Sequence, residues 1–223
     1  TEDGFHHSDR MEVEWRRCGQ PGPVVASMQA MFAPFTKLQH LGVVEGKEMH
    51  NVGGLLPALQ HMAQLTSLEM GIDRGVEPYL RHLPASLVVL TMGAEYNSCH
   101  VVHLEQGESI EQYEDRWPPP MDLSHLTSLT KLVLARDAPF VVQAGDVLPP
   151  NVRDLEAPSV LSWDPILAMS QLQVLQSGHM PPEAASSMVT KLTALQEVSI
   201  SLHKGDESDD KTLNRDTVRA YAK

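Results

Sequence analysis

Apolar residues recur along the chain in one short frame, in which two positions separate the first and second apolar residues and one position separates the second and third. Seven copies occur in the 223 residues, two of them ending in a small residue. Apolar residues two positions apart share one face of a strand, because side chains alternate along a strand. Each copy therefore predicts one short strand with a single buried face. The copies are Leu38-x-x-Leu41-x-Val43, Leu65-x-x-Leu68-x-Met70, Leu87-x-x-Leu90-x-Met92, Leu129-x-x-Leu132-x-Leu134, Val152-x-x-Leu155-x-Ala157, Leu172-x-x-Leu175-x-Ser177 and Leu195-x-x-Val198-x-Ile200.

The spacing of these frames indicates a stack of similar units. Their middle apolar residues are 27, 22, 42, 23, 20 and 23 residues apart. One such strand cannot bury its apolar face alone, so each unit must stack on its neighbours, which builds a parallel sheet over a continuous core. Partly apolar segments between the strands are expected to form the opposite wall of this core, some as short helices and some as turns set by proline. These segments are 54–62, 76–83, 148–151, 165–169 and 184–192.

The frame resembles the L-x-x-L-x-L core of the leucine-rich repeat family, most closely in the fragments LTSLEM, LTSLTKLVL and LTALQEVSI. The resemblance covers roughly residues 35–203. It implies an α/β repeat solenoid, curved, with short parallel strands on the concave face and short helices or turns on the convex face. The sequence departs from the family where an Asn or Cys normally bonds the backbone of the turn, which predicts a less regular solenoid. That slot holds Gly46, Asp73, Glu95, Asp137, Val160, Met180 and His203.

The repeat divides the chain into three parts. Residues 1–34 are predicted to be a flanking segment or a degenerate cap repeat, with a strand-like alternation over 11–15 and a helix over 24–32. Residues 35–203 are the solenoid. The step of 42 residues is interpreted as an insertion at about 94–121, with a worn repeat as the alternative. Residues 204–223 are predicted to form an acidic turn and a capping helix over 211–223. The alternative for the whole chain is an α/β globule in which the Leu-rich runs are amphipathic helices.

The composition of the chain indicates which partners and which cellular compartment to expect. The chain has 17 Lys and Arg against 29 Asp and Glu, a formal charge of −12. An acidic surface repels phosphate backbones, which argues against nucleic acid as a partner. The apolar stretches fall short of the roughly 18 residues that a spanning helix needs, which argues against membrane insertion. Two cysteines and no Asn-x-Ser/Thr acceptor favour an intracellular protein over an extracellular one. Because the chain opens at Thr1, we expect a processed protein or part of a longer one.

Common catalytic signatures are missing from the sequence. There is no Gly-x-Ser-x-Gly elbow, His-Glu-x-x-His helix, Walker loop or Gly-x-Gly-x-x-Gly after a strand. We therefore expect no enzymatic activity, no cofactor and no metal. The alternative of another class is a metal-dependent enzyme that uses the segment 99–105. Its Cys99, His100, His103 and Glu105 are the densest group of metal-ligating side chains, but on a strand only Cys99 and His103 would share a face.

The surface predicted to contact a partner is the concave face, which receives the residues between and beside the buried strand positions. Few charges at its centre are typical of protein-binding surfaces. Small residues just after the strands would let a partner approach, or would reflect crowding where the sheet bends. The candidate residues on this face are His40, Glu69, Thr91, Lys131, Val133, Arg136, Asp154, Glu156, Gln176 and Glu197. On or near the insertion, Tyr96, Tyr113 and Trp117 are candidate aromatic anchors, or else residues that pack the insertion onto the solenoid.

These observations predict a non-catalytic scaffold for protein–protein interaction. The chain would serve as an adaptor or as an accessory subunit of a multi-subunit complex. The step from a repeat solenoid to binding follows from the family resemblance, because fold alone does not define function. The alternative is the substrate- or ligand-recognition region of a receptor or ubiquitin ligase, with the other domains outside this chain.

Overall fold

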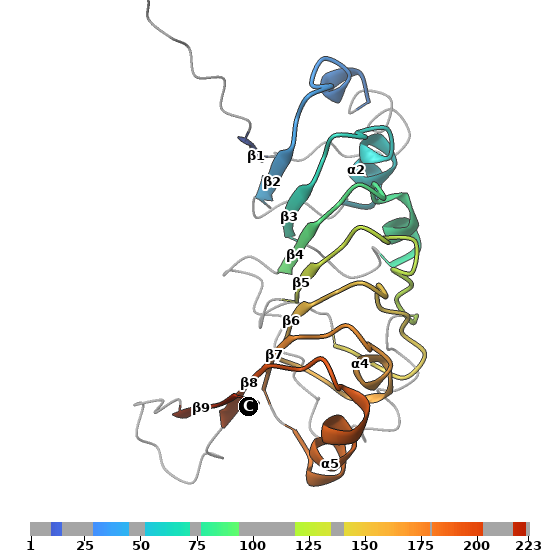
Figure 1. Cartoon of the computed structure of the whole chain (residues 1–223). Helices are drawn as coiled ribbons and strands as arrows, with labels where there is room; N and C mark the ends of the chain where they lie inside the picture. The colour runs from blue at the N-terminus through green and yellow to red at the C-terminus, as the bar shows by residue number, and fades with distance from the viewer. Residues whose placement is uncertain are drawn as a thin grey trace, which may run out of the picture.

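A single sheet organises the part of the chain that the structure, a computed structural model, describes. That part comprises residues 10–14, 29–44, 52–71, 77–93, 119–134, 141–178, 180–202 and 216–221. Nine strands in these residues form the sheet, and their order in the sheet is their order along the chain. Figure 1 shows the strands following one another down the molecule. They are β1 (Arg10–Glu14), β2 (His40–Val44), β3 (Ser67–Gly71), β4 (Val89–Gly93), β5 (Lys131–Leu134), β6 (Asp154–Ala157), β7 (Val174–Ser177), β8 (Glu197–Leu202) and β9 (Asp216–Tyr221).

Strands β1 to β8 are parallel, and their register aligns the repeated frame of the sequence. The middle apolar residue of each frame pairs with that of the next, from Leu41 opposite Leu68 to Leu175 opposite Val198. All of these side chains are buried except Val198, which is partly buried against the core. The seven predicted strands are therefore confirmed, and the fold is α/β with a parallel sheet. The alternative in which the Leu-rich runs form amphipathic helices is wrong.

Short helices lie on one side of this sheet (Figure 1). They coincide with the segments expected to form the opposite wall of the core, and residues 29–32 are helical as well. In the part of the chain described above, no helix is long and apolar enough to cross a membrane. The named helices are α2 (Val52–Leu59), the 3-10 helix η1 (Glu77–His82), α4 (Asp164–Leu167) and α5 (Pro182–Lys191).

The core continues from the strands into these helices and the turns that follow them. Leu56 of α2, Leu80 of η1 and Ile166 of α4 are completely buried. The turns before three of the strands also carry buried apolar residues at intervals of three. These runs are Leu59, Met62, Leu65 before β3, Leu123, Leu126, Leu129 before β5 and Ile166, Met169, Leu172 before β7. The repeated frame found in the sequence includes only the last residue of such a run, for example Leu65. In these units the buried apolar residues therefore extend into the turn that precedes the frame.

A repeated set of hydrogen bonds joins each unit to the previous one. The carbonyl before one strand accepts two amides of the next unit, from the residue before the next strand and from the first residue of that strand, as when Gln39 accepts from Thr66 and Ser67. The same pattern recurs at the carbonyls of Thr66, Val88, Thr130, Arg153 and Gln173. Two threonine hydroxyls add to it, because Thr66 Oγ1 lies 3.2 Å from the Gln39 carbonyl and Thr130 Oγ1 lies 3.3 Å from that of Val88.

Polar side chains in the turns make two further contacts between neighbouring units. Ser86 Oγ donates to the Leu65 carbonyl at 2.7 Å, and the side-chain amide of Asn151 donates to the Thr127 carbonyl at 2.7 Å. These contacts satisfy backbone carbonyls on the side of the sheet where each strand begins. A buried or half-buried carbonyl without a donor would be costly.

One end of the sheet agrees with the expectation from the sequence and the other differs from it. The strand-like alternation over 11–15 is confirmed as β1. The helix predicted over 211–223 is wrong, because β9 is a strand that pairs antiparallel with β8 from Glu197 opposite Tyr221 to Leu202 opposite Asp216. Strand β9 contains β-branched and aromatic residues, which favour strands. Its pairing also covers the edge of β8, which would otherwise expose unpaired backbone groups. The acidic turn over 204–210 lies outside the described residues.

The step of 42 residues from Leu90 to Leu132 adds no strand to the sheet between β4 and β5. Val89 of β4 is the direct register partner of Lys131 of β5. Residues 94–118, which make up most of the proposed insertion, lie outside the described residues. After them the chain continues through Met121, Leu123 and Leu126, which are buried in the core of the β5 unit.

Candidate functional site

The strand residues that alternate with the buried ones form what we call the outer face of the sheet. It consists of two columns, each with one residue from every strand between β2 and β8, held in register by the parallel pairing. All of these residues except the buried Gly42 are exposed or half-buried. The first column is His40, Ser67, Val89, Lys131, Asp154, Val174 and Glu197, and the second is Gly42, Glu69, Thr91, Val133, Glu156, Gln176 and Ser199.

Nine of the candidate residues lie on this single face, and Arg136 is not among the described residues. Residues 135–140 lie outside the described residues, as do Tyr96, Tyr113 and Trp117. Two apolar members of the first column, Val89 and Val174, were missing from the candidates. The repeat pattern places both in the same slot as Lys131, so they were expected on this face although they were not chosen as binding candidates.

The middle of the outer face is apolar or neutral. Thr91 of β4 pairs directly with Val133 of β5 in the second column, and Val89 lies two residues before Thr91 on the same strand and face. All three side chains are half-buried. Neighbouring strands lie about 4.8 Å apart, so side chains at paired positions contact one another. This centre has the low charge that the cores of protein interfaces show.

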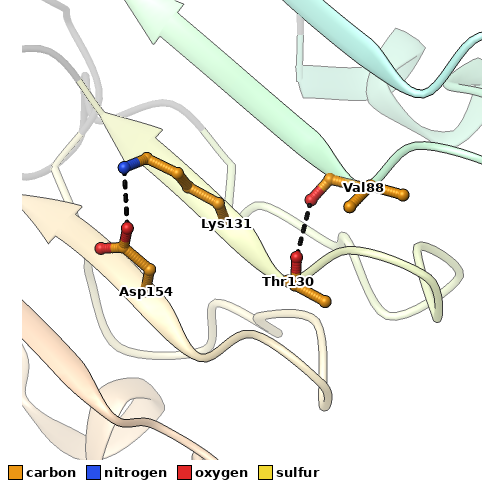
Figure 2. A network of polar contacts seen from close by, with 4 residues as sticks. All are labelled: Val88, Thr130, Lys131 and Asp154. Atoms are coloured by element: carbon orange, nitrogen blue, oxygen red, sulfur yellow. Dashed lines mark hydrogen bonds and ion pairs between the residues drawn. The ribbon is translucent and has the colours of Figure 1, made fainter.

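An ion pair lies beside this centre in the first column. Lys131 Nζ lies 2.7 Å from Asp154 Oδ2, and the two residues are direct register partners on β5 and β6 (Figure 2). Their side chains are 44% and 28% exposed. Figure 2 also shows the Thr130 hydroxyl bonded to the Val88 carbonyl at the start of β5. The pairing leaves the only lysine of the outer face neutralised, with Asp154 Oδ1 buried and without a hydrogen-bond partner.

The remaining charges on the outer face are carboxylates. Glu69 on β3 is exposed, and Glu156 on β6 and Glu197 on β8 are half-buried. In the part of the chain that the structure describes, none of the three forms an ion pair. The face therefore has a neutral centre with unpaired negative charge on both sides along the sheet. This result refines the expectation of a weakly charged surface, because the excess charge has one sign.

At Gly178, packing against the preceding unit explains why the residue just after the strand is small. A Cβ atom on Gly178 would overlap the carbonyl oxygen of Pro158, which occupies the same slot in the preceding unit. Glycine lacks this atom and lets the two backbones approach. At this pair of units, crowding between neighbours accounts for the small residue without any partner.

A buried carboxylate, Asp146, lies away from the outer face. Its two oxygens accept the backbone N–H groups of Met121 at 2.7 Å and Gln143 at 2.8 Å. Burial raises the pKa of Asp146, against the opposing effect of these two hydrogen bonds. Because both oxygens are engaged with backbone, we interpret Asp146 as a structural group that ties residue 121 to the turn at 143–146. No motif or repeat position in the sequence marks Asp146.

Groups of metal-ligating side chains are not found among the described residues, where no three His, Cys, Asp or Glu residues could hold an ion together. The segment 99–105, which carries the alternative prediction of a metal site, lies outside those residues.

Comparisons with known proteins add no assignment to this picture. No family model matches the chain, and a search of curated proteins found no significant match. The fold and the site together define an α/β protein with a sheet of consecutive parallel strands, whose outer face has a neutral centre and flanking carboxylates.

Proposed function

We propose that the chain is a leucine-rich repeat solenoid that binds a protein partner on the outer face of its sheet. The outer face would be the concave face of the solenoid, and the protein would act as a non-catalytic adaptor or as an accessory subunit of a larger assembly. The observation that carries this proposal is the in-register outer face of seven strands, with Val89, Thr91 and Val133 half-buried at its centre.

The repeating hydrogen bonds support the solenoid part of the proposal. The same pair of amide donors meets a carbonyl of the preceding unit at six consecutive steps. A structure in which each unit contacts mainly its neighbours is the physical basis of solenoid proteins. Such proteins use the extended surface of the stacked strands for binding.

The chemistry of the outer face supports a protein as the partner. Carboxylates would repel a nucleic-acid backbone, and the neutral centre offers apolar contact area to side chains of a partner. Interfaces combine such a centre with a polar rim. The outer face has this arrangement along the direction that crosses the strands, from Glu69 through Thr91 and Val133 to Glu156.

The test is purification of the native protein under mild conditions, followed by native mass spectrometry of the assembly. We expect a companion protein in fixed stoichiometry. Val133→Arg places a charged, larger side chain at the centre of the outer face and should remove the companion. Val189→Arg is the matched control, because Val189 is 79% exposed on α5 and the substitution is the same. Circular dichroism should show the same secondary structure in both variants.

Three outcomes would contradict the proposal. One is a bare monomer of the native protein, and another is a companion that both variants retain. The third is a companion that both variants lose while their folds remain intact, since binding would then not depend on the outer face.

A further inference from the structure

The second column of the outer face places two carboxylates at a defined separation. Glu69 on β3 and Glu156 on β6 are three strands apart, with Thr91 and Val133 on the two strands between them. Strands of a sheet are about 4.8 Å apart, so the two positions are separated by about 14 Å across the sheet. Both glutamates belong to the exposed or half-buried residues and form no ion pair within the described part of the chain.

An extended peptide matches this separation at one particular spacing. A strand rises about 3.3 to 3.4 Å per residue, so residues four positions apart are about 13 to 14 Å apart. Alternation of side chains directs the first, third and fifth residues of such a segment to the same side. The third residue would then lie between Thr91 and Val133, where an apolar side chain finds apolar contacts.

The first column of the outer face does not cancel the negative charge of Glu69 and Glu156. Lys131, whose strand lies between those of Glu69 and Glu156, is paired with Asp154 at 2.7 Å. Glu197, further along the first column, adds negative charge. A cationic segment therefore meets complementary charge along the sheet, whereas an acidic segment of the same shape would be repelled. Such complementarity contributes more to the choice of partner than to raw affinity.

We propose that the outer face binds an extended protein segment with two cationic side chains four residues apart and an apolar side chain midway between them. The segment crosses the strands, with its cations at Glu69 and Glu156 and its apolar residue on Thr91 and Val133. This inference rests on the proposed function, because it names the kind of partner that the same face takes.

The test uses the full chain and capped, fluorophore-labelled peptides measured by fluorescence anisotropy. The matching peptide has the sequence GSKSLSKSG, with lysines four residues apart. A peptide of the same composition, GSSKLKSSG, has its lysines two residues apart, and GSESLSESG reverses the charge. We expect the first peptide to bind most tightly and the acidic peptide to show no measurable binding. Raising the salt concentration should weaken binding of the first peptide, because exposed charges are screened.

Variants of the protein identify the residues that bind. Each exposed carboxylate–cation contact is worth about two- to fivefold in affinity, so E69Q and E156Q should each weaken binding of the matching peptide by about that factor. Charge reversal in E69K and E156K should weaken it further, by about five- to twentyfold. E183K is the matched control, because Glu183 is exposed on α5, on the helix side of the sheet, and the change in net charge is the same. We expect E183K to bind like the unmodified chain.

Two results would overturn the inference. One is equal binding of the two lysine peptides, or of lysine and acidic peptides, by the unmodified chain. The other is an equal loss of binding in E69K, E156K and E183K, which would indicate a general charge effect. Either result leaves the proposed function standing if the native companion still depends on Val133. Loss of that dependence would instead contradict the proposed function itself.

Discussion

Gly178 lies against the backbone of Pro158 so closely that a Cβ atom on Gly178 would overlap the Pro158 carbonyl oxygen. The two residues occupy the same position in consecutive units, just after β7 and β6. The obstructing atom belongs to the backbone, so it cannot move aside as the end of a side chain could. The approach of these two units therefore requires the absence of a side chain at Gly178.

The first prediction follows from this contact. Gly178→Ala should lower the free energy of unfolding by about 1 to 3 kcal/mol, the range typical of added atoms in closely packed places. Chemical denaturation of both proteins, monitored by circular dichroism, measures the change. An unchanged midpoint would show that the two units separate without cost and that the small residues after the strands need another explanation.

Ser177 gives the second prediction. Its side chain is 5% exposed on the inner face of β7, and its hydroxyl oxygen has no hydrogen-bond partner in the structure. A buried hydroxyl without a partner is unfavourable, so Ser177→Ala should leave the free energy of unfolding unchanged or raise it by up to about 1 kcal/mol. The same denaturation experiment compares it with the adjacent Gly178→Ala. A loss of more than about 1 kcal/mol would mean that the hydroxyl has a partner in solution.

The sequence predicted the strands well because the information is local and repeated. Apolar residues two apart, as in Leu132 and Leu134, indicate a one-faced strand, and seven copies fix the register between units. The outer face followed from the same alternation, and nine of its fourteen residues were among the candidates. The turns before three of the strands were underestimated, because buried residues three apart, such as Met62 and Leu65, do not match the period of a strand.

Features that depend on contacts between distant residues could not be predicted in this way. The ion pair of Lys131 with Asp154 requires the register of β5 and β6, although the opposite charges stand in the same slot of consecutive frames. Asp146 bonds to the backbone of residue 121, and nothing in the local sequence marks that contact. At the C-terminal end, a capping helix was predicted over 211–223, but residues 216–221 pair with β8 as a strand.

The third prediction concerns the core that the repeat defines. Leu132 is completely buried in the middle of the sheet, so Leu132→Ala should lower the free energy of unfolding by about 2 to 5 kcal/mol. Gln176→Ala is a suitable control, because Gln176 is exposed on the outer face and its truncation should change stability by no more than about 0.5 kcal/mol. Thermal and urea unfolding report both values. Similar small effects at the two positions would contradict the assignment of inner and outer faces.

The last prediction concerns the dependence of stability on pH. Burial raises the pKa of Asp146 in the folded chain above its value in the unfolded chain. As the pH rises from the usual carboxyl range through the raised value, the unfolded chain gives up this proton first. The folded state then holds the excess proton, so the contribution of Asp146 to stability falls as the pH rises. Asp146→Asn cannot ionise and should remove this fall, so the difference in unfolding free energy between the unmodified chain and the variant should shrink with increasing pH.

Asp122 provides a control of opposite sign. Hydrogen bonds from the Ser124 side chain and backbone lower the pKa of Asp122, so its contribution is present above the usual carboxyl range and is lost as the pH falls through the lowered value. Asp122→Asn should therefore alter the acidic end of the profile, whereas Asp146→Asn alters the range above it. Urea unfolding of the three proteins at a series of pH values separates the two windows. A difference between the unmodified chain and Asp146→Asn that grows with pH would mean that hydrogen bonding to the charged carboxylate outweighs its burial.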